Sequence, residues 1–289
     1  MIERSVTRGR FAPSPTGPLH LGSLVAALAS YLMAKSQQGQ WIIRIEDLDP
    51  PREIAGMAEQ QLRSLANFGL QSDLPVVWQS SRAELYEEAL QTLFATDNVF
   101  HCSCSRTQLL AQNGIHLSCV APLTHQSSSI RLRALNKDIE FTDTLYGLQQ
   151  QNMRAEVGDV VLKRADRLYA YQLAVVVDDA EQGINQIVRG EDLLSSTARQ
   201  IFLQQQLGLS TPAYAHIPLV RDELGQKLSK SQWAANLDNQ DRFNALCAAL
   251  THLGQDISLL SRQLSAEKNL QRALQYFSIQ ALKDTRARE

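Results

Sequence analysis

The spacing of hydrophobic and polar positions alternates between strand and helix periods in the first half of the chain. Residues 8–12 and 41–45 are short runs typical of strands, and residues 19–35 between them carry apolar side chains at helical spacing. A strand, a helix and a strand within about fifty residues form a βαβ unit, which implies a parallel sheet. Three further elements are predicted next: amphipathic helices over 55–68 and 82–96, and a short strand at 76–78.

The pattern changes at His101. From there to about Gln151 we expect mostly loop, with short strand signals such as 130–133, and we interpret this segment as an insertion. Strand patterning returns at 160–163 and again at 171–179, which puts Tyr171 at the start of a strand. Three later elements are predicted: a helix over 193–207, a strand over 216–220, and helices from Asp241 onward.

These elements predict an α/β fold, a Rossmann-type doubly wound parallel sheet with an insertion and a small helical C-terminal region. We expect four parts. They are the first half of the Rossmann-type core (1–100), the insertion (101–158), the second half of the core (159–236) and the helical C-terminal region (237–289).

The composition excludes a disordered chain but does not identify a binding partner. Of the 289 residues, 44% are hydrophobic and 20% are charged, which is typical of globular proteins. A net charge of −2 gives no overall basic field that would attract nucleic acid, although a local basic patch remains compatible with it. The first residues lack a secretory signal, and the run 19–34 is too short and too polar to span a bilayer. We therefore expect a cytoplasmic protein without a membrane segment.

Three of the four cysteines are crowded together with a histidine. The spacing is Cys102-x-Cys104, then eleven residues to His116, then two to Cys119. Three thiolates and one imidazole satisfy tetrahedral zinc, although the one-residue gap is tighter than the usual two to four. His101 and His125 are rival fourth ligands, and three reduced thiols without metal are the alternative. We predict one structural zinc that stiffens the insertion.

Three segments carry candidate chemistry. Residues 13–23 join a strand to a helix, where His20 and free backbone N–H groups can bind phosphate and Gly22 makes room for a nucleotide. Residues 227–231 combine two lysines with two hydroxyls, a cationic set able to stabilise a transferring phosphoryl group. Glu46 lies in an acidic cluster after a strand, at the edge where ligands bind in parallel sheets. Taken singly, each segment also has a purely structural explanation: a capped turn for the first, a solvated basic loop for the second and an acidic turn for the third.

Taken together, these segments resemble the class I aminoacyl-tRNA synthetases. Residues 20–23 resemble the HIGH signature and residues 227–231 the KMSKS signature. Ser23 replaces the second histidine of the first motif, so the role of that histidine is not carried here. Leu228 replaces methionine in the second motif, which is an apolar exchange.

The resemblance narrows to glutamyl-tRNA synthetase catalytic domains. Residues 10–17, 44–49 and 174–179 look like that family, and the match extends over most of 8–235. Residues 187–194 are similar to a shortened subgroup that attaches glutamate to queuosine in the anticodon loop of tRNA(Asp). That subgroup has a Cys, Cys, Tyr, Cys pattern in its insertion, where this chain has His116 in the third position.

Length agrees with the shortened subgroup. After Ser231 only 58 residues follow, fewer than the ~100–200 of a usual domain. We therefore expect no anticodon-reading domain of the kind that glutamyl-tRNA synthetases carry.

The resemblance implies a ligase that works in two steps with ATP and Mg²⁺. Glutamate first attacks the α-phosphate of ATP without tRNA, and a hydroxyl of the queuosine cyclopentenediol then takes the acyl group from glutamyl-adenylate. Arg10, Ser14, Glu46, Tyr171 and Arg189 are implied to bind glutamate. The implied ATP-binding residues are His20, Gly22, Ser23, Lys227, Ser229 and Lys230, of which His20, Lys227 and Lys230 would be catalytic.

Other functions stay open at this point. A truncated glutamyl-tRNA synthetase could charge the 3′ end of a tRNA, and a class I nucleotidyltransferase could act on a small acid. A non-catalytic RNA-binding paralogue would not need His20, Gly22, Lys227 and Lys230 together. We expect a monomer whose partners are L-glutamate, ATP and tRNA(Asp) bearing queuosine.

Overall fold

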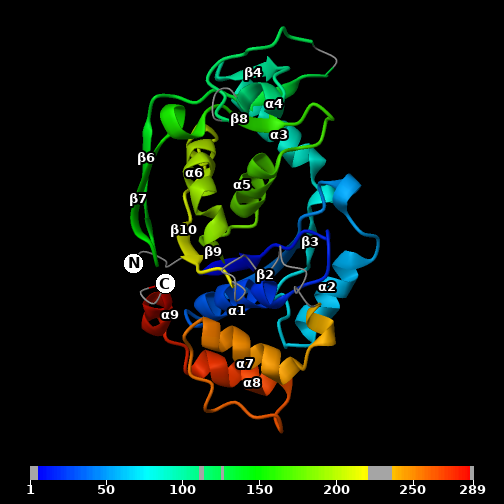
Figure 1. Cartoon of the computed structure of the whole chain (residues 1–289), viewed down its shortest axis with the longest axis vertical. Coiled ribbons are helices and arrows are strands. Elements are labelled where there is room, and N and C mark those ends of the chain that lie inside the picture. The colour runs from blue at the N-terminus through cyan, green and yellow to red at the C-terminus, as the bar shows by residue number, and fades with distance from the viewer. Residues whose placement is uncertain (1–5, 111–113, 125–126, 221–235, 287–289) are drawn as a thin grey trace.

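A seven-stranded, mostly parallel sheet forms the centre of the computed structural model, which describes residues 6–110, 114–124, 127–220 and 236–286 (Figure 1). Its strands are β1 (Arg8–Phe11), β2 (Gln40–Ile45), β3 (Val77–Trp78), β6 (Asp138–Asp143), β7 (Gly147–Asn152), β9 (Gln186–Gly190) and β10 (Ala213–Ile217). They lie in the order β3-β2-β1-β9-β10-β6-β7, and all neighbours are parallel except the β6–β7 hairpin. The predicted doubly wound α/β fold is confirmed.

Helices cover both faces of this sheet (Figure 1). The helices of the structure are α1 (Leu21–Lys35), α2 (Met57–Ala66), α3 (Ala83–Phe94), α4 (Arg106–Leu109), α5 (Tyr171–Glu181), α6 (Thr197–Gln206), α7 (Arg242–His252), α8 (Ala266–Gln275) and α9 (Ile279–Arg286). Of these, the short α4 lies beside the second sheet instead. Trp41, Ile43 and Ile45 of β2 pack in one core with α1, α7 and α8, whereas Ile42 packs in a second core with α3, α5 and α6. The alternation follows from the two-residue period of a strand.

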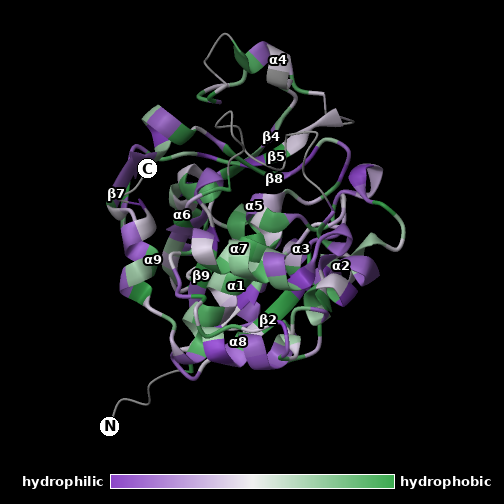
Figure 2. Ribbon diagram, turned by 60° about the horizontal axis from the view of Figure 1, so that its bottom comes forward, coloured by the Kyte–Doolittle hydropathy of each residue, from purple (hydrophilic) through white to green (hydrophobic). Residues whose placement is uncertain are grey.

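Apolar residues are concentrated in these two cores. Figure 2 shows hydrophobic colours around α1 and α7 and hydrophilic colours on the outer face of α8. Among the described residues, no helix is both long and apolar enough to cross a bilayer.

The switch point of the sheet lies between β1 and β9. From β1 the chain builds outward to β2 and β3, and β10 continues on the other side of β9. In such sheets ligands bind outside the carboxyl ends of the strands at this point, here beside Phe11 and Gly190. Gly9 lets α1 approach β1 closely, because an added Cβ would lie 3.2 Å from the Ala34 Cβ.

A second, antiparallel sheet lies beyond α5 and α6 (Figure 1). It consists of β4 (Val99–Cys102), β5 (Ser129–Leu132) and β8 (Val160–Lys163) in the order β4-β5-β8. The first cysteine of the cluster ends β4. Short helical turns connect the larger elements at Pro50–Arg52, Gln79–Ser81, Met153–Val157, Glu191–Ser196 and Leu237–Asn239.

The prediction of a strand over 171–179 was wrong, because this segment is the helix α5. Its run of apolar residues through Val177 is buried on most sides, and periodicity alone does not separate a buried helix from a buried strand. The predicted strand at 216–220 lies earlier, at Ala213–Ile217, and ends before Pro218, whose nitrogen has no hydrogen to donate.

The prediction of mostly loop over 101–151 was also wrong for its second half. The hairpin of β6 and β7 extends the main sheet there, and β6 pairs with β10 through Asp143 and Tyr214. Its strands carry charged and amide side chains, mostly on exposed positions, so they lack the apolar run by which a strand is recognised.

We predict that Leu28→Ala lowers the free energy of unfolding by about 2–5 kcal/mol, because it leaves a cavity in a site of zero exposure. Urea denaturation followed by circular dichroism measures it. The matched control is Leu148→Ala, whose side chain is 70% exposed and whose loss should cost under about 0.5 kcal/mol. Equal losses in the two variants would contradict the placement of α1 in the core.

Candidate functional site

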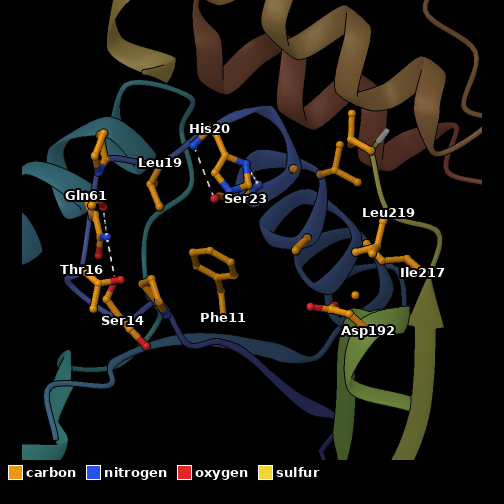
Figure 3. A pocket seen from close by; sticks show the side chains of 18 of the residues that line it. Phe11, Ser14, Thr16, Leu19, His20, Ser23, Gln61, Asp192, Ile217 and Leu219 are labelled. Atoms are coloured by element: carbon orange, nitrogen blue, oxygen red, sulfur yellow. Dashed lines mark hydrogen bonds between the residues drawn. The ribbon is translucent and has the colours of Figure 1, made fainter. Parts of the chain in front are cut away.

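The side chain of His20 caps the first turn of α1. The ring Nδ1 accepts a hydrogen bond from the backbone N–H of Ser23 at 3.3 Å, and the Ser23 hydroxyl accepts one from the backbone N–H of His20 at 3.4 Å (Figure 3). This reciprocal pair satisfies two donors at the helix start. Ser23, the departure from the HIGH signature, therefore completes the cap.

The cap fixes which nitrogen of His20 can act as a donor. Because Nδ1 accepts, the neutral ring carries its proton on Nε2, which can donate to a phosphate oxygen. The positive end of the α1 dipole adds to this preference for an anion. A Cβ at Gly22 would lie 3.0 Å from the His20 Cε1, so this glycine makes room for the imidazole itself.

A pocket of about 620 Å³ opens in front of this helix start (Figure 3). The loop after β1, the first turn of α1 and the segments after β9 and β10 form its walls. In Figure 3, Ser14 and Thr16 lie on one side of Phe11, and Asp192 and Ile217 lie on the other. The pocket occupies the crevice at the switch point of the sheet, and its volume suits a nucleotide.

Gln61 of α2 holds the loop that forms one wall of this pocket. Its buried side chain donates through Nε2 to the carbonyl oxygens of Ser14 at 3.0 Å and Gly17 at 2.7 Å. The sequence did not reveal this role, because Gln61 lies more than forty positions from both partners.

A second pocket, of about 380 Å³, adjoins the first, and Ser14 and Thr16 line both. Glu46, which follows β2, and Tyr171, the first residue of α5, line its other side. The structure thus brings together three of the five residues that we predicted to bind glutamate.

Glu46 is a buried carboxyl group beside two arginines. Burial raises its pKa, and the charges of Arg44 and Arg10 oppose that rise without cancelling it. The Glu46 Oε1 accepts a hydrogen bond from Arg44 at 3.3 Å. Burial, followed by the Glu46 charge, also raises the pKa of Tyr171, whose phenol therefore stays a hydrogen-bond donor. A cationic substrate group would complete the charge balance of this pocket.

Arg10 is buried, does not line the second pocket and already binds a carboxylate of the chain. Its Nε and Nη2 donate to the two oxygens of Asp179 at 3.1 and 3.3 Å. Arg44 donates to the same Asp179 at 2.8 Å. The fork that we expected to face a substrate carboxylate is thus engaged by α5, and the Nη1 of Arg10 takes no part in these bonds.

Arg189 of β9 is likewise buried and held by the chain. Its Nε donates to the Nε2 of His216 at 3.0 Å, and its Nη groups donate to Gln200 at 2.7 Å and Thr197 at 2.8 Å. The His216 Nδ1 then carries the proton and donates to Asp143 at 2.7 Å. Burial lowers the pKa of His216 and keeps the ring neutral. Sequence analysis missed His216 and Asp143, which lie 73 positions apart.

The remaining predicted site residues, Lys227, Ser229 and Lys230, lie outside the described residues.

The four predicted zinc ligands are gathered at one place, at the end of β4 and in the loops that follow it. The Sγ atoms of Cys102, Cys104 and Cys119 and a ring nitrogen of His116 all lie within 4.8 Å of one another. Tetrahedral zinc with Zn–S bonds of about 2.3 Å needs such atoms roughly 3.8 Å apart, so a small contraction suffices. His101 is not in this group and lies 3.1 Å from the Ser128 hydroxyl, while His125 lies outside the described residues.

The surroundings of the cluster also suit a metal. The His116 Nδ1 donates to the buried carboxylate of Asp159 at 2.7 Å, which turns Nε2 toward the Cys102 sulfur at 3.2 Å. Such a carboxylate partner orients zinc-binding histidines in known sites. Although burial raises the pKa of the Cys104 thiol, the backbone N–H groups of Val120 and Ala121 are among the groups that lower it to about 7.

We predict one zinc per chain in the purified protein, bound in part by His116. His116→Asn should lose the metal, and Asp159→Asn should weaken its affinity by about 10–100-fold, because the imidazole loses its orienting partner. Elemental analysis and competition with a chromophoric chelator measure the two effects.

The matched control is His101→Asn, which should keep its zinc. Metal-free wild-type protein with freely titrating thiols would contradict the zinc site, and loss of zinc in His101→Asn would contradict the ligand assignment.

Comparison with known proteins agrees with the geometry. The family model of the catalytic domain of class I tRNA synthetases (E and Q) matches residues 6–122 and 122–257. A curated relative from Xanthomonas axonopodis pv. citri, called glutamyl-Q tRNA(Asp) synthetase, is 55% identical over 93% of this chain and 90% of its own length. A relative of the same name from Burkholderia cenocepacia is 50% identical over 86% of this chain and 88% of its own length.

Solved structures show the same fold. A glutamate tRNA ligase from Elizabethkingia meningosepticum, in complex with its amino acid, superposes with a TM-score of 0.76 at 23% identity and covers 95% of this chain. This chain spans 65% of that ligase and 66% of a glutamate-tRNA synthetase from Elizabethkingia anophelis. The chain therefore belongs to the class I tRNA synthetases of the glutamyl and glutaminyl (E and Q) type, and it is an enzyme of the ligase class.

Proposed function

We propose that the enzyme activates L-glutamate with ATP in the absence of tRNA and then transfers glutamate to the queuosine of tRNA(Asp). The observation that carries the proposal is the pair of adjoining pockets that share Ser14 and Thr16. One offers a helix N-terminus for phosphates, and the other offers a buried carboxylate between two arginines. The name of the curated relatives, glutamyl-Q tRNA(Asp) synthetase, supplies the acceptor.

Activation requires no nucleophile from the enzyme. A carboxylate oxygen of glutamate attacks the α-phosphorus of ATP, and pyrophosphate leaves with the electron pair of the broken P–O bond. The chain contributes positioning and electrostatic stabilisation. The His20 Nε2–H donates to a phosphate oxygen, Gly22 and Ser23 keep that ring in place, and Mg²⁺ accompanies ATP. Lys227, Ser229 and Lys230 are proposed to stabilise the charge on the pentavalent α-phosphate in this step.

The second pocket matches the charges of glutamate. Glu46 accepts hydrogen bonds from the ammonium, and Tyr171 and Ser14 add hydroxyl contacts. Arg10 and Arg189 do not line this pocket and compensate the two carboxylates through their charges, and the Nη1 of Arg10 is not used in its bonds to Asp179. In the second step a hydroxyl of the cyclopentenediol attacks the acyl carbon, AMP leaves, and the hydroxyl proton is released.

We expect labelled glutamate and ATP to label tRNA(Asp) that bears queuosine and to leave tRNA(Asp) without queuosine unlabelled. Acid precipitation after incubation measures transfer. Ribonuclease digestion separates the two possible acceptors, because the label then stays either with the anticodon-loop fragment or with the 3′-terminal nucleotide. Label only on the 3′ ribose would favour a truncated synthetase, and pyrophosphate exchange independent of amino acid would favour a nucleotidyltransferase.

We also predict that Glu46→Gln raises the KM for glutamate in pyrophosphate–ATP exchange about 10–100-fold, because it removes a charge-assisted hydrogen bond to the ammonium. Burial raises the Glu46 pKa, so the wild-type KM should rise as the pH falls through that raised pKa and the carboxylate is protonated. The variant should lose this part of the pH dependence.

The control for this variant is Glu181→Gln, which removes a half-exposed carboxylate that binds Arg82 outside both pockets. Its KM should match the wild type. A KM unchanged in Glu46→Gln would remove Glu46 from the glutamate site.

A further inference from the structure

A third cleft, of about 850 Å³, separates the second sheet from the helices α5 and α6. Three of the four predicted zinc ligands, Cys102, Cys104 and His116, line one part of it, and another part extends to the start of α5. Arg52, Arg164 and Tyr171 line both this cleft and the 380 Å³ pocket. The two pockets and this cleft therefore form a series. Ser14 lines both the 620 Å³ and the 380 Å³ pocket, and Tyr171 lines both the 380 Å³ pocket and the cleft.

Arginines dominate the charge of this cleft. Four of them line it, Arg52, Arg131, Arg164 and Arg199, against the two carboxylates of Asp159 and Asp166. Arg52 and Arg164 are paired, since both bind Asp49 and Arg164 also binds Asp166. The excess positive charge therefore rests on Arg131 and Arg199.

Neither of these two arginines forms an ion pair with a carboxylate of the described residues. Arg131 is 7% exposed, and its Nη1 donates to the backbone oxygen of Asp159 at 3.2 Å. The Nε atoms of Arg131 and Arg199 are buried without a hydrogen-bond partner among the described residues. Burial lowers the pKa of Arg199, and no carboxylate opposes that effect. A guanidinium nitrogen that is buried without an acceptor is unfavourable, so an anion in the cleft would stabilise both side chains.

We propose that this cleft binds the acceptor nucleotide and that Arg131 and Arg199 bind its phosphodiester. The proposal rests on the proposed function, because the acceptor is the substrate that must reach the activated glutamate. A guanidinium presents paired donors that fit phosphate oxygens. The volume of the cleft lies within the range of pockets that hold one small ligand. Tyr171 lines both the proposed amino-acid pocket and this cleft, so the two substrates would meet beside it.

The other anions of the reaction have sites elsewhere. The phosphates of ATP belong to the start of α1, beside His20 and Ser23, and neither residue lines this cleft. The carboxylates of glutamate belong near Arg10 and Arg189, which also do not line it. A phosphodiester of tRNA is the remaining anion in the proposed reaction.

The test is Arg199→Gln, with tRNA(Asp) bearing queuosine as the probe. We expect the KM for tRNA to rise about tenfold, with a much smaller change in the KM values for ATP and glutamate in pyrophosphate–ATP exchange. Fluorescence anisotropy with labelled tRNA should show that the slope of log Kobs against log salt falls in magnitude by about 0.7, the value for one phosphate contact on a single strand.

Two further variants make the result specific. Arg199→Lys keeps the charge but loses the fork, so its KM for tRNA should lie between those of the wild type and Arg199→Gln. Arg262→Gln removes an exposed arginine that binds Asp241 in the C-terminal region, and it should bind tRNA with the wild-type slope. Thermal unfolding of each variant separates a loss of folding from a loss of the contact with tRNA. If Arg199→Gln does not fold, Arg199→Lys takes its place in the binding and kinetic measurements.

Unchanged tRNA affinity and salt slope in Arg199→Gln would overturn the proposal. So would a rise confined to the KM for ATP or glutamate, because the anion would then belong to the activation step. The anisotropy measurement reports tRNA binding and does not depend on glutamate transfer. It therefore tests the cleft even if the wild-type enzyme attaches no glutamate to queuosine. That last result would contradict the proposed function but not the binding site.

Discussion

The carboxylate of Asp179 connects three elements whose mutual placement defines the active site. It accepts hydrogen bonds from Arg10 of β1 and from Arg44 of β2, and all three side chains are at most 4% exposed. Burial raises the pKa of Asp179, but the two arginines outweigh it and hold the pKa below its usual value. Its stabilisation is therefore present above the unfolded pKa of about 3.9 and is lost as the pH falls through the lowered pKa.

This ion network explains why the substrate pockets have their charges. Because Asp179 orients Arg10 and Arg44, the two arginines lie beside Glu46, where their charges oppose the effect of burial on its pKa. The same contact fixes α5, whose first residue, Tyr171, lines both the amino-acid pocket and the cleft toward the insertion. The neighbouring Asp178 accepts a hydrogen bond from Arg82 at 2.6 Å and one from Tyr86 at 2.8 Å, which holds α3 against α5.

Local patterns were sufficient to predict the parts of the fold that sequence neighbours determine. The βαβ unit, the cap at His20 and the cysteine cluster all depend on residues close in the chain. The helix α5 was mispredicted because burial on most sides removes the polar face from which a helix is recognised. Gln61, Asp143 and His216 were missed because their partners lie far away in sequence. Asp179 was within a motif quoted for the family, but nothing local indicated that it binds two arginines.

The measurement that most directly tests this account is the stability and glutamate activation of Asp179→Asn, compared with the wild type in urea denaturation and in pyrophosphate–ATP exchange. The account predicts a loss of about 3–5 kcal/mol in unfolding free energy, because two buried guanidinium groups lose their shared counter-ion. It also predicts a raised KM for glutamate in whatever fraction folds. Wild-type stability together with a wild-type KM would contradict the claim that this carboxylate organises the site.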